Sequence, residues 1–149
     1  THNIQYYLAR TTHGSTLSRI VYAVLNQLDD NDDDAWKLFS EALASDYYDI
    51  QGGTTAEGIH LGVMGATLNL VTRNFGGVSP LGTHLQVNPQ LPDHWQTLKF
   101  KQLFRGVHYV FVIDHHRVTV TADQPSTVQI GNQQYQLQAK KPRTITYND

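Results

Sequence analysis

Two short clusters of hydroxyl residues, glycines and histidines stand where helices are expected to begin. The first spans Thr11–Ser18 and the second spans Gly52–His60. A helix N-terminus favours anions because it combines unpaired N–H groups with the positive end of the helix dipole. Glycines also let an anion approach the backbone closely. If both clusters face one cleft, they predict a pocket for phosphate or sulfate.

A purely structural interpretation of both clusters stays open. Ser and Thr before a helix commonly cap its first N–H groups, and a Gly-Gly pair commonly forms a turn. His60 lies on an otherwise apolar stretch. It is therefore either an additional donor for an anion or a hydrogen-bonded histidine of the core.

Covalent and acid–base catalysis have little support in the sequence. Ser15 and His13 lack the strand–turn–helix context of a nucleophile elbow. Glu57 is expected to be used in a helix cap. Asp46 and Asp49 lie in a loop whose orientation the sequence does not fix. We therefore expect no pair of catalytic carboxylates within the chain.

Metal sites are not predicted either. There is no cysteine, which excludes thiolate ligands, disulfides and cysteine nucleophiles. The acidic run Asp29–Asp34 lacks the glycine and the distal glutamate of an EF-hand loop, so it predicts a solvated turn. His115-His116 also predicts a turn, because no further ligand has a suitable spacing.

Composition narrows the class of protein. The chain has 149 residues, with 40% hydrophobic and 16% charged residues, which is typical of globular proteins. Its formal net charge is -2 and its basic residues are scattered, which argues against nucleic acid or an anionic membrane as partner. We find no apolar run long enough for a bilayer span and no signal-peptide pattern in Thr1–Leu8. Together with the absence of cysteine, this predicts a cytoplasmic location.

The chain has a helical pattern before Gly76 and a strand pattern after it. Apolar residues at a period of about 3.6 predict the helices. A capping box, Thr54 to Glu57, is expected to open the third helix. The three expected helices cover Thr16–Leu28, Asp34–Ala44 and Thr54–Phe75.

Alternating apolar and polar residues predict a meander of short antiparallel strands in the second half. Turns are expected at Arg105-Gly106, at Asp114–His116 and at Gly131-Asn132, the last as a type II′ hairpin. The expected strands cover Leu98–Lys101, Val107–Ile113, Arg117–Ala122, Val128–Ile130 and Tyr135–Leu137.

The helical half is expected to pack against further protein. Three helices cannot close a barrel, and the third is apolar around most of its circumference, so two neighbours cannot cover it. The sequence predicts an α+β fold with two domains, residues 1–78 and 79–149.

Two strings of residues resemble a known family. Thr12–Ser18 and Asp49–Gly62 are similar to the corresponding parts of glycoside hydrolase family 65, which includes maltose, trehalose and kojibiose phosphorylases. Asn88–Pro92 resembles the family's join between helices and strands, and Leu103–Gly106 its next strand. The resemblance covers roughly Arg10 to Val120.

The resemblance implies an α/α toroid of six helical hairpins followed by a small antiparallel β-sandwich. This chain would supply the last helices of the toroid and the sandwich. It also implies an inverting enzyme, in which a glutamic acid protonates the leaving oxygen and inorganic phosphate attacks the anomeric carbon. Phosphate is then a co-substrate, and no cofactor or metal is implied. The catalytic glutamate belongs to a region before Thr1, so this chain holds no catalytic residue and is expected to be inactive alone.

The resemblance further implies which residues contact phosphate. Carried over position by position, the family's pocket corresponds to Ser15, Thr55 and His60, with His13 and Gly14 beside them. The implied partners are a disaccharide, phosphate and the remainder of the chain's own catalytic domain, and a homo-oligomer is left open. The order Gly65-Ala66 departs from the family's usual pattern, which leaves the disaccharide undefined.

Two other functions remain as alternatives. The first is a trehalase-like hydrolase of the same family, which would use water in place of phosphate. The second is a carbohydrate-binding or structural β-sandwich without a catalytic part. In that case aromatic side chains such as Tyr109, Phe111 and Tyr135 would stack on sugar, although alternating strands more often bury such residues.

Overall fold

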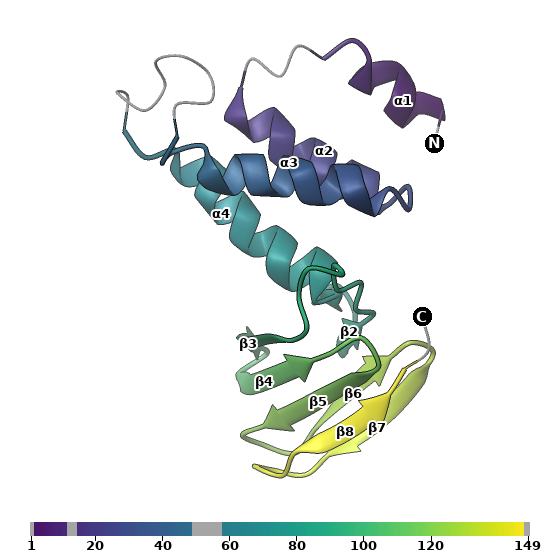
Figure 1. The fold of residues 1–149 in the computed structure, drawn as a ribbon. Helices are drawn as coiled ribbons and strands as arrows, with labels where there is room; N and C mark the ends of the chain where they lie inside the picture. The colour runs from purple at the N-terminus through teal and green to yellow at the C-terminus, as the bar shows by residue number, and fades with distance from the viewer. Residues whose placement is uncertain (1, 12–14, 49–57, 148–149) are drawn as a thin grey trace. The chain divides into compact units, whose positions relative to one another are not determined.

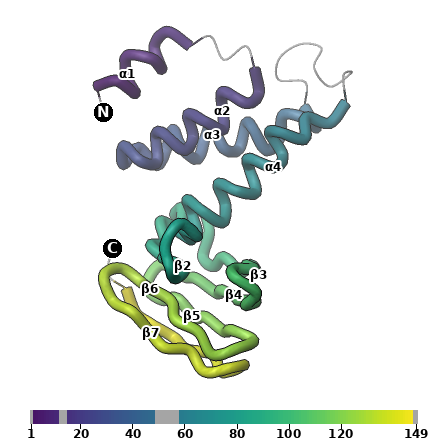
Figure 2. Tube along the Cα trace, turned by 180° about the vertical axis from the view of Figure 1, so that it is seen from behind, coloured from purple at the N-terminus to yellow at the C-terminus, as the bar shows by residue number. Residues whose placement is uncertain are grey.

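The computed structural model describes residues 2–11, 15–48 and 58–147. The chain forms two compact units, Thr1–Val71 and Thr72–Asp149, which are drawn in Figures 1 and 2. One unit is built from helices and the other from strands, which confirms the α+β class. The predicted domain limits, 1–78 and 79–149, stay a prediction.

Three helices of the first unit contact one another, namely α2 (Thr16–Gln27), α3 (Asp32–Ala44) and α4 (Leu61–Asn69). Ser15 caps α2, because its side chain accepts a hydrogen bond from the Leu17 N–H at 3.3 Å. Three aspartates lie in the first turn of α3, where the helix dipole favours negative charge. The first two expected helices are therefore confirmed, with α3 starting two residues earlier than expected.

The third helix begins later than the sequence predicted. Gly58–His60 is not helical, and α4 starts at Leu61. A continuous helix from Thr54 to Phe75 is therefore wrong, whereas the capping box Thr54–Glu57 itself lies outside the described residues. Gly58 has a φ of +98°, a conformation that an α-helix cannot include, which explains why the helix does not extend back through this position.

One helix was not expected, and the expected third helix changes form before it ends. α1 (His2–Leu8) precedes α2, and it buries none of its residues. After α4 the chain widens into the π-helix η2 (Leu70–Phe75). The expectation of three helices before Gly76 is thus wrong. A seven-residue helix without a buried stripe leaves no periodic signal in the sequence.

The second unit is a sandwich of two four-stranded sheets. One sheet has the order β1-β2-β6-β7 and the other has the order β3-β4-β5-β8. Neighbouring strands are antiparallel except β2 and β6, which are parallel with Leu85 opposite Val128. The strands are β1 (Val78–Ser79), β2 (Leu85–Val87), β3 (Leu98–Phe104), β4 (Val107–Ile113), β5 (Arg117–Ala122), β6 (Ser126–Ile130), β7 (Gln133–Leu137) and β8 (Arg143–Thr146).

The simple meander that we expected is therefore only partly right. The five expected strands correspond to β3–β7, and the turn at Arg105-Gly106 is confirmed by the β3–β4 pairing. Gly131 alone has a positive φ in the β6–β7 turn, as a type II′ hairpin requires. β1, β2 and β8 were not predicted, and neither was the parallel pairing of β2 and β6.

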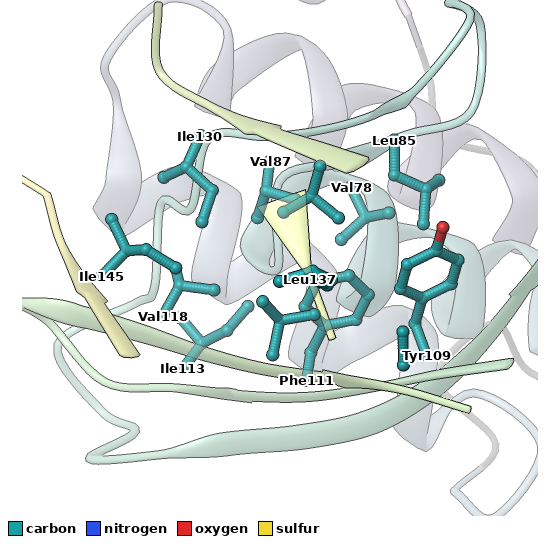
Figure 3. Packing of buried hydrophobic residues seen from close by; sticks show 13 residues of the cluster. Val78, Leu85, Val87, Tyr109, Phe111, Ile113, Val118, Ile130, Leu137 and Ile145 are labelled. Atoms are coloured by element: carbon teal, nitrogen blue, oxygen red, sulfur yellow. The ribbon is translucent and has the colours of Figure 1, made fainter. Parts of the chain in front are cut away.

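Apolar side chains from both sheets fill the interior of the sandwich (Figure 3). Phe111 of β4 is completely buried, and its ring stacks on Phe100 of β3 with ring centroids 5.3 Å apart. The two residues also lie opposite each other in the β3–β4 ladder. Such cross-strand aromatic pairs stabilise a sheet beyond the area that they bury.

A carboxylate holds the turn between β4 and β5. Asp114 accepts hydrogen bonds from the backbone N–H groups of His116 and Arg117, and it pairs with the Arg117 guanidinium at 2.9 Å. The two N–H groups and the guanidinium hold the pKa of Asp114 below its usual range. The predicted turn at Asp114–His116 is thus confirmed, and the His115 Nε2 lies 2.8 Å from the Trp95 carbonyl oxygen.

We expect Asp114→Asn to lower the stability of the sandwich modestly at neutral pH. A carboxylate with a lowered pKa in the folded state stabilises that state above its unfolded pKa, near 3.8. This contribution is lost as the pH falls through the lower folded-state pKa. Urea unfolding midpoints should therefore differ at neutral pH and converge in acid. The exposed Asp93→Asn serves as the control, and a difference that persists in acid would contradict the assignment.

Candidate phosphate-binding site

The predicted site residues fall into two groups. Ser15 and His60 are described, whereas His13, Gly14 and Thr55 lie outside the described residues. Ser15 is the exposed N-cap of α2, and His60 is the residue immediately before α4. His60 was expected one turn inside its helix, and the structure corrects this: it occupies the N-cap position.

The helices next to these residues meet at one end of the helical unit. Figures 1 and 2 both show α2 and α4 beginning at the end of the unit where α3 finishes. The chain runs out along α2 and back along α3, so the N-terminus of the first and the C-terminus of the second are neighbours. Ser15, Asp46 and His60 therefore belong to the same end of the unit.

Asp46 holds His60 by two contacts. Its Oδ2 accepts the His60 backbone N–H at 2.8 Å, and its Oδ1 lies 2.6 Å from the ring Nδ1. The Asp46 side chain is 13% exposed and the His60 side chain is 29% exposed. The hydrogen bond from the His60 ring holds the pKa of Asp46 below its usual range. Asp46 is therefore an ionised acceptor whose two oxygens both face His60.

Asp46 was not among the predicted site residues. This residue was expected in a loop of unknown orientation, and no rule of spacing links Asp46 to a histidine fourteen positions later. The contact exists because α3 ends where α4 begins, which is a property of the tertiary fold. The local signal was limited to an acidic residue two positions after a helix that ends at Ala44.

The helical unit exposes much of its apolar surface. Among the described residues, every exposed large apolar side chain except Leu81 and Leu103 belongs to this unit. In and beside α4, Ile59, Leu61 and Leu68 are all more than two-thirds exposed. Exposed apolar area of this kind marks an interaction surface. This agrees with the expectation that the helices pack against further protein.

The described part of the sandwich offers no aromatic platform for sugar. Tyr109 and Phe111 are core residues. Tyr135 is partly buried, its hydroxyl donates to Gln133, and its ring lies under the Arg143 guanidinium. Between residues 72 and 147, no Phe, Tyr or Trp side chain is exposed. This finding weighs against the alternative of a carbohydrate-binding sandwich.

The described residues contain neither a cluster of metal ligands nor a membrane-spanning helix. No group of three or more His, Asp or Glu side chains there is arranged to hold a metal ion. In the same part of the chain, the helices are too short or too polar to cross a bilayer.

Both halves of the chain match one enzyme family. The profile of the Glycosyl hydrolase family 65 central catalytic domain matches residues 1–69, and that of the family's C-terminal domain matches residues 79–137. The chain therefore belongs to glycosyl hydrolase family 65, and the resemblance seen in Thr12–Ser18 and Asp49–Gly62 is confirmed.

Two similar proteins with assigned activities are phosphorylases. Trehalose 6-phosphate phosphorylase of Lactococcus lactis subsp. lactis (strain IL1403) is 43% identical over 137 residues, which are 92% of this chain and 18% of that protein. The 1,2-alpha-glucosylglycerol phosphorylase of Bacillus selenitireducens is 31% identical over 123 residues, 80% of this chain and 16% of the relative. The chain thus spans less than a fifth of the length of these two relatives.

A solved structure has the same fold. It comes from the human microbiome and is provisionally named kojibiose phosphorylase. It superposes with a TM-score of 0.83 at 24% sequence identity, covering 98% of this chain and 21% of that one. The likeness supports the fold described above for nearly the whole chain.

Proposed function

We propose that this chain is the C-terminal part of an inverting α-glucoside phosphorylase that transfers a glucosyl group to inorganic phosphate. The observation that carries the proposal is the clamped His60 at the start of α4, in a chain of family 65. The relatives named above are phosphorylases of an α-linked glucoside or its phosphate ester. Phosphate is then the co-substrate, and no other cofactor is required.

In this proposal the chain supplies part of the phosphate pocket. The starts of α2 and α4 offer N–H groups and positive dipole ends. Ser15 adds a hydroxyl that can donate to a phosphate oxygen, and the His60 ring adds a nitrogen. Thr55, His13 and Gly14 complete the predicted set. The acid that protonates the leaving oxygen lies outside this chain.

The phosphate site replaces the second carboxylate of an inverting hydrolase. Such a hydrolase needs a general base that activates water, whereas phosphate is itself a nucleophile. Asp46 is the described carboxylate beside the site, yet both of its oxygens accept hydrogen bonds from His60 and its pKa is lowered. A weakly basic, occupied carboxylate is a poor general base. Asp46 is therefore poorly suited to be the general base that the trehalase-like alternative would need.

The partners follow from the same assignment. The exposed apolar side chains of the helical unit, such as Leu61 and Leu68, would be covered by the rest of the catalytic domain. The enzyme would bind a disaccharide or its phosphate ester. Trehalose 6-phosphate is the first compound to test, because a 43% identical relative is named a phosphorylase of this compound. Homo-oligomer formation and a cytoplasmic location stay predictions.

The complete enzyme should release a sugar 1-phosphate from an α-glucoside only when inorganic phosphate is present. Trehalose 6-phosphate, trehalose, maltose and kojibiose are assayed separately, with and without phosphate, and the products are separated by chromatography. The 149-residue chain alone should give no turnover. Equal release of free glucose in both conditions would instead identify a hydrolase.

A further inference from the structure

Asp46 reaches His60 through both of its oxygens, and this geometry constrains the histidine more than a single contact would. One oxygen accepts the backbone N–H at 2.8 Å and fixes where α4 begins. The other lies 2.6 Å from Nδ1 and fixes the rotation of the ring. A residue held at its backbone and at its ring has little freedom to present its remaining atoms differently.

The chemistry of the contact determines which ring nitrogen carries a proton. A carboxylate whose pKa is lowered has no proton to donate, so it can only accept. Nδ1 must therefore be the donor in the 2.6 Å contact. Histidines that bind metals are oriented in the same way, by a carboxylate on the nitrogen that does not meet the ligand.

From this geometry we infer that Asp46 is a positioning residue, which accepts the Nδ1 proton of His60 and turns Nε2 toward the phosphate. There Nε2 donates to a phosphate oxygen when the ring carries both protons, and accepts from a protonated phosphate oxygen when it carries one. The inference rests on the proposed phosphate site, because it gives His60 its ligand. Asp46 itself touches neither phosphate nor sugar in this scheme. Its effect on phosphate passes through His60.

A second pair in the chain provides a matched control. Asp123 accepts the His108 backbone N–H at 2.9 Å and lies 3.0 Å from the His108 Nδ1, so it repeats the two-point clamp. The His108 side chain is 70% exposed and belongs to the sandwich, outside the helical unit. The Asp123→Asn variant removes the same kind of contact where no phosphate is expected.

The first experiment measures which nitrogen of the His60 ring carries the proton. Nitrogen-15 spectra of the imidazoles are recorded for the full chain and for Asp46→Asn, with His60→Gln identifying the signals. In the wild type, the Nδ1 of His60 should carry the proton. In Asp46→Asn this preference should be lost, because an amide can face the ring with either its oxygen or its NH2 group. An unchanged His60 spectrum would overturn the inference, whether or not the enzyme uses phosphate.

The second experiment measures the KM for phosphate and the kcat of the complete enzyme. Asp46→Asn should raise the KM for phosphate about tenfold, with a smaller change in kcat, and Asp123→Asn should leave both near wild type. In the background of His60→Ala, Asp46→Asn should add little, since residues that act through one another are not additive.

Other outcomes would contradict the inference or the proposed function. Full additivity of the two substitutions, or loss of folding in Asp46→Asn, would overturn the inference by giving Asp46 a role independent of His60. If the enzyme proves to be a hydrolase, the proposed function fails, and the spectra alone then decide whether Asp46 sets the ring. A changed spectrum with an unchanged KM for phosphate would remove phosphate as the reason for the clamp.

Discussion

The His60→Ala variant of the complete enzyme is expected to bind phosphate roughly 10- to 100-fold more weakly than the wild type. Phosphate carries between one and two negative charges near neutral pH. A charge-assisted hydrogen bond to such an anion contributes about 1.5–3 kcal/mol. The alanine keeps the backbone N–H that Asp46 holds, so the start of α4 should survive the change. The KM for phosphate, from initial rates at saturating sugar, measures the effect.

His108→Ala is the control, because it removes a clamped histidine from the sandwich. It should leave the KM for phosphate at the wild-type value. The structural interpretation of His60 makes the opposite prediction. If this residue only packs and hydrogen-bonds, the His60→Ala enzyme would melt at a lower temperature while its KM for phosphate stayed unchanged. Measuring both quantities on one variant decides between the two.

Replacing Gly77 with alanine is expected to destabilise the sandwich by about 3–5 kcal/mol, enough to unfold a marginal domain. Gly77 has a φ of +65°, which alone costs an L-residue roughly 1–2 kcal/mol. A Cβ at this position would also lie 1.8 Å from the backbone oxygen of Asn88. Neither the Cβ nor the backbone oxygen of Asn88 can move away by a side-chain rotation. The hydrogen bond from the Asn88 N–H to the Gly77 oxygen would therefore be disturbed.

Gly131→Ala separates the two causes. Gly131 has a similar φ of +57°, but a Cβ there would meet nothing within 4 Å. It should therefore cost only about 1–2 kcal/mol. Urea unfolding followed by Trp95 fluorescence, in a Trp36→Phe background, would report on the sandwich. Equal losses in the two variants would mean that the close approach at Asn88 relaxes without cost.

The sequence predicted the elements that carry a local signal. β4 and β5 alternate buried and less buried residues, and their turns contain Gly106 or Asp114, so both strands were found. β1, β2 and β8 are two to four residues long, which is too short for a periodic pattern. Their existence depends on pairing with strands that are distant in the sequence.

The site was predictable in its parts and not in its arrangement. Ser15 and His60 were nominated because their neighbours match a family motif, and both stand at helix starts. The start of α4 was misplaced, since a capping box indicates a helix without excluding a turn after it. Asp46 was missed because it reaches His60 only where the end of α3 lies beside the start of α4. That contact is defined by the tertiary fold and not by the local sequence.

The parallel pairing of β2 with β6 has a consequence for how the chain folds. Leu85 pairs with Val128, and the Asn88 side chain accepts the Gly131 N–H across 43 residues. Loop closure over such a distance must precede any gain from the contact, whereas the helices need only nearby residues. On the ribosome, α2 and α3 can therefore form early, while β2 waits for β6 to be synthesised. Until then β2 presents an unpaired edge, which can pair with a strand of another chain.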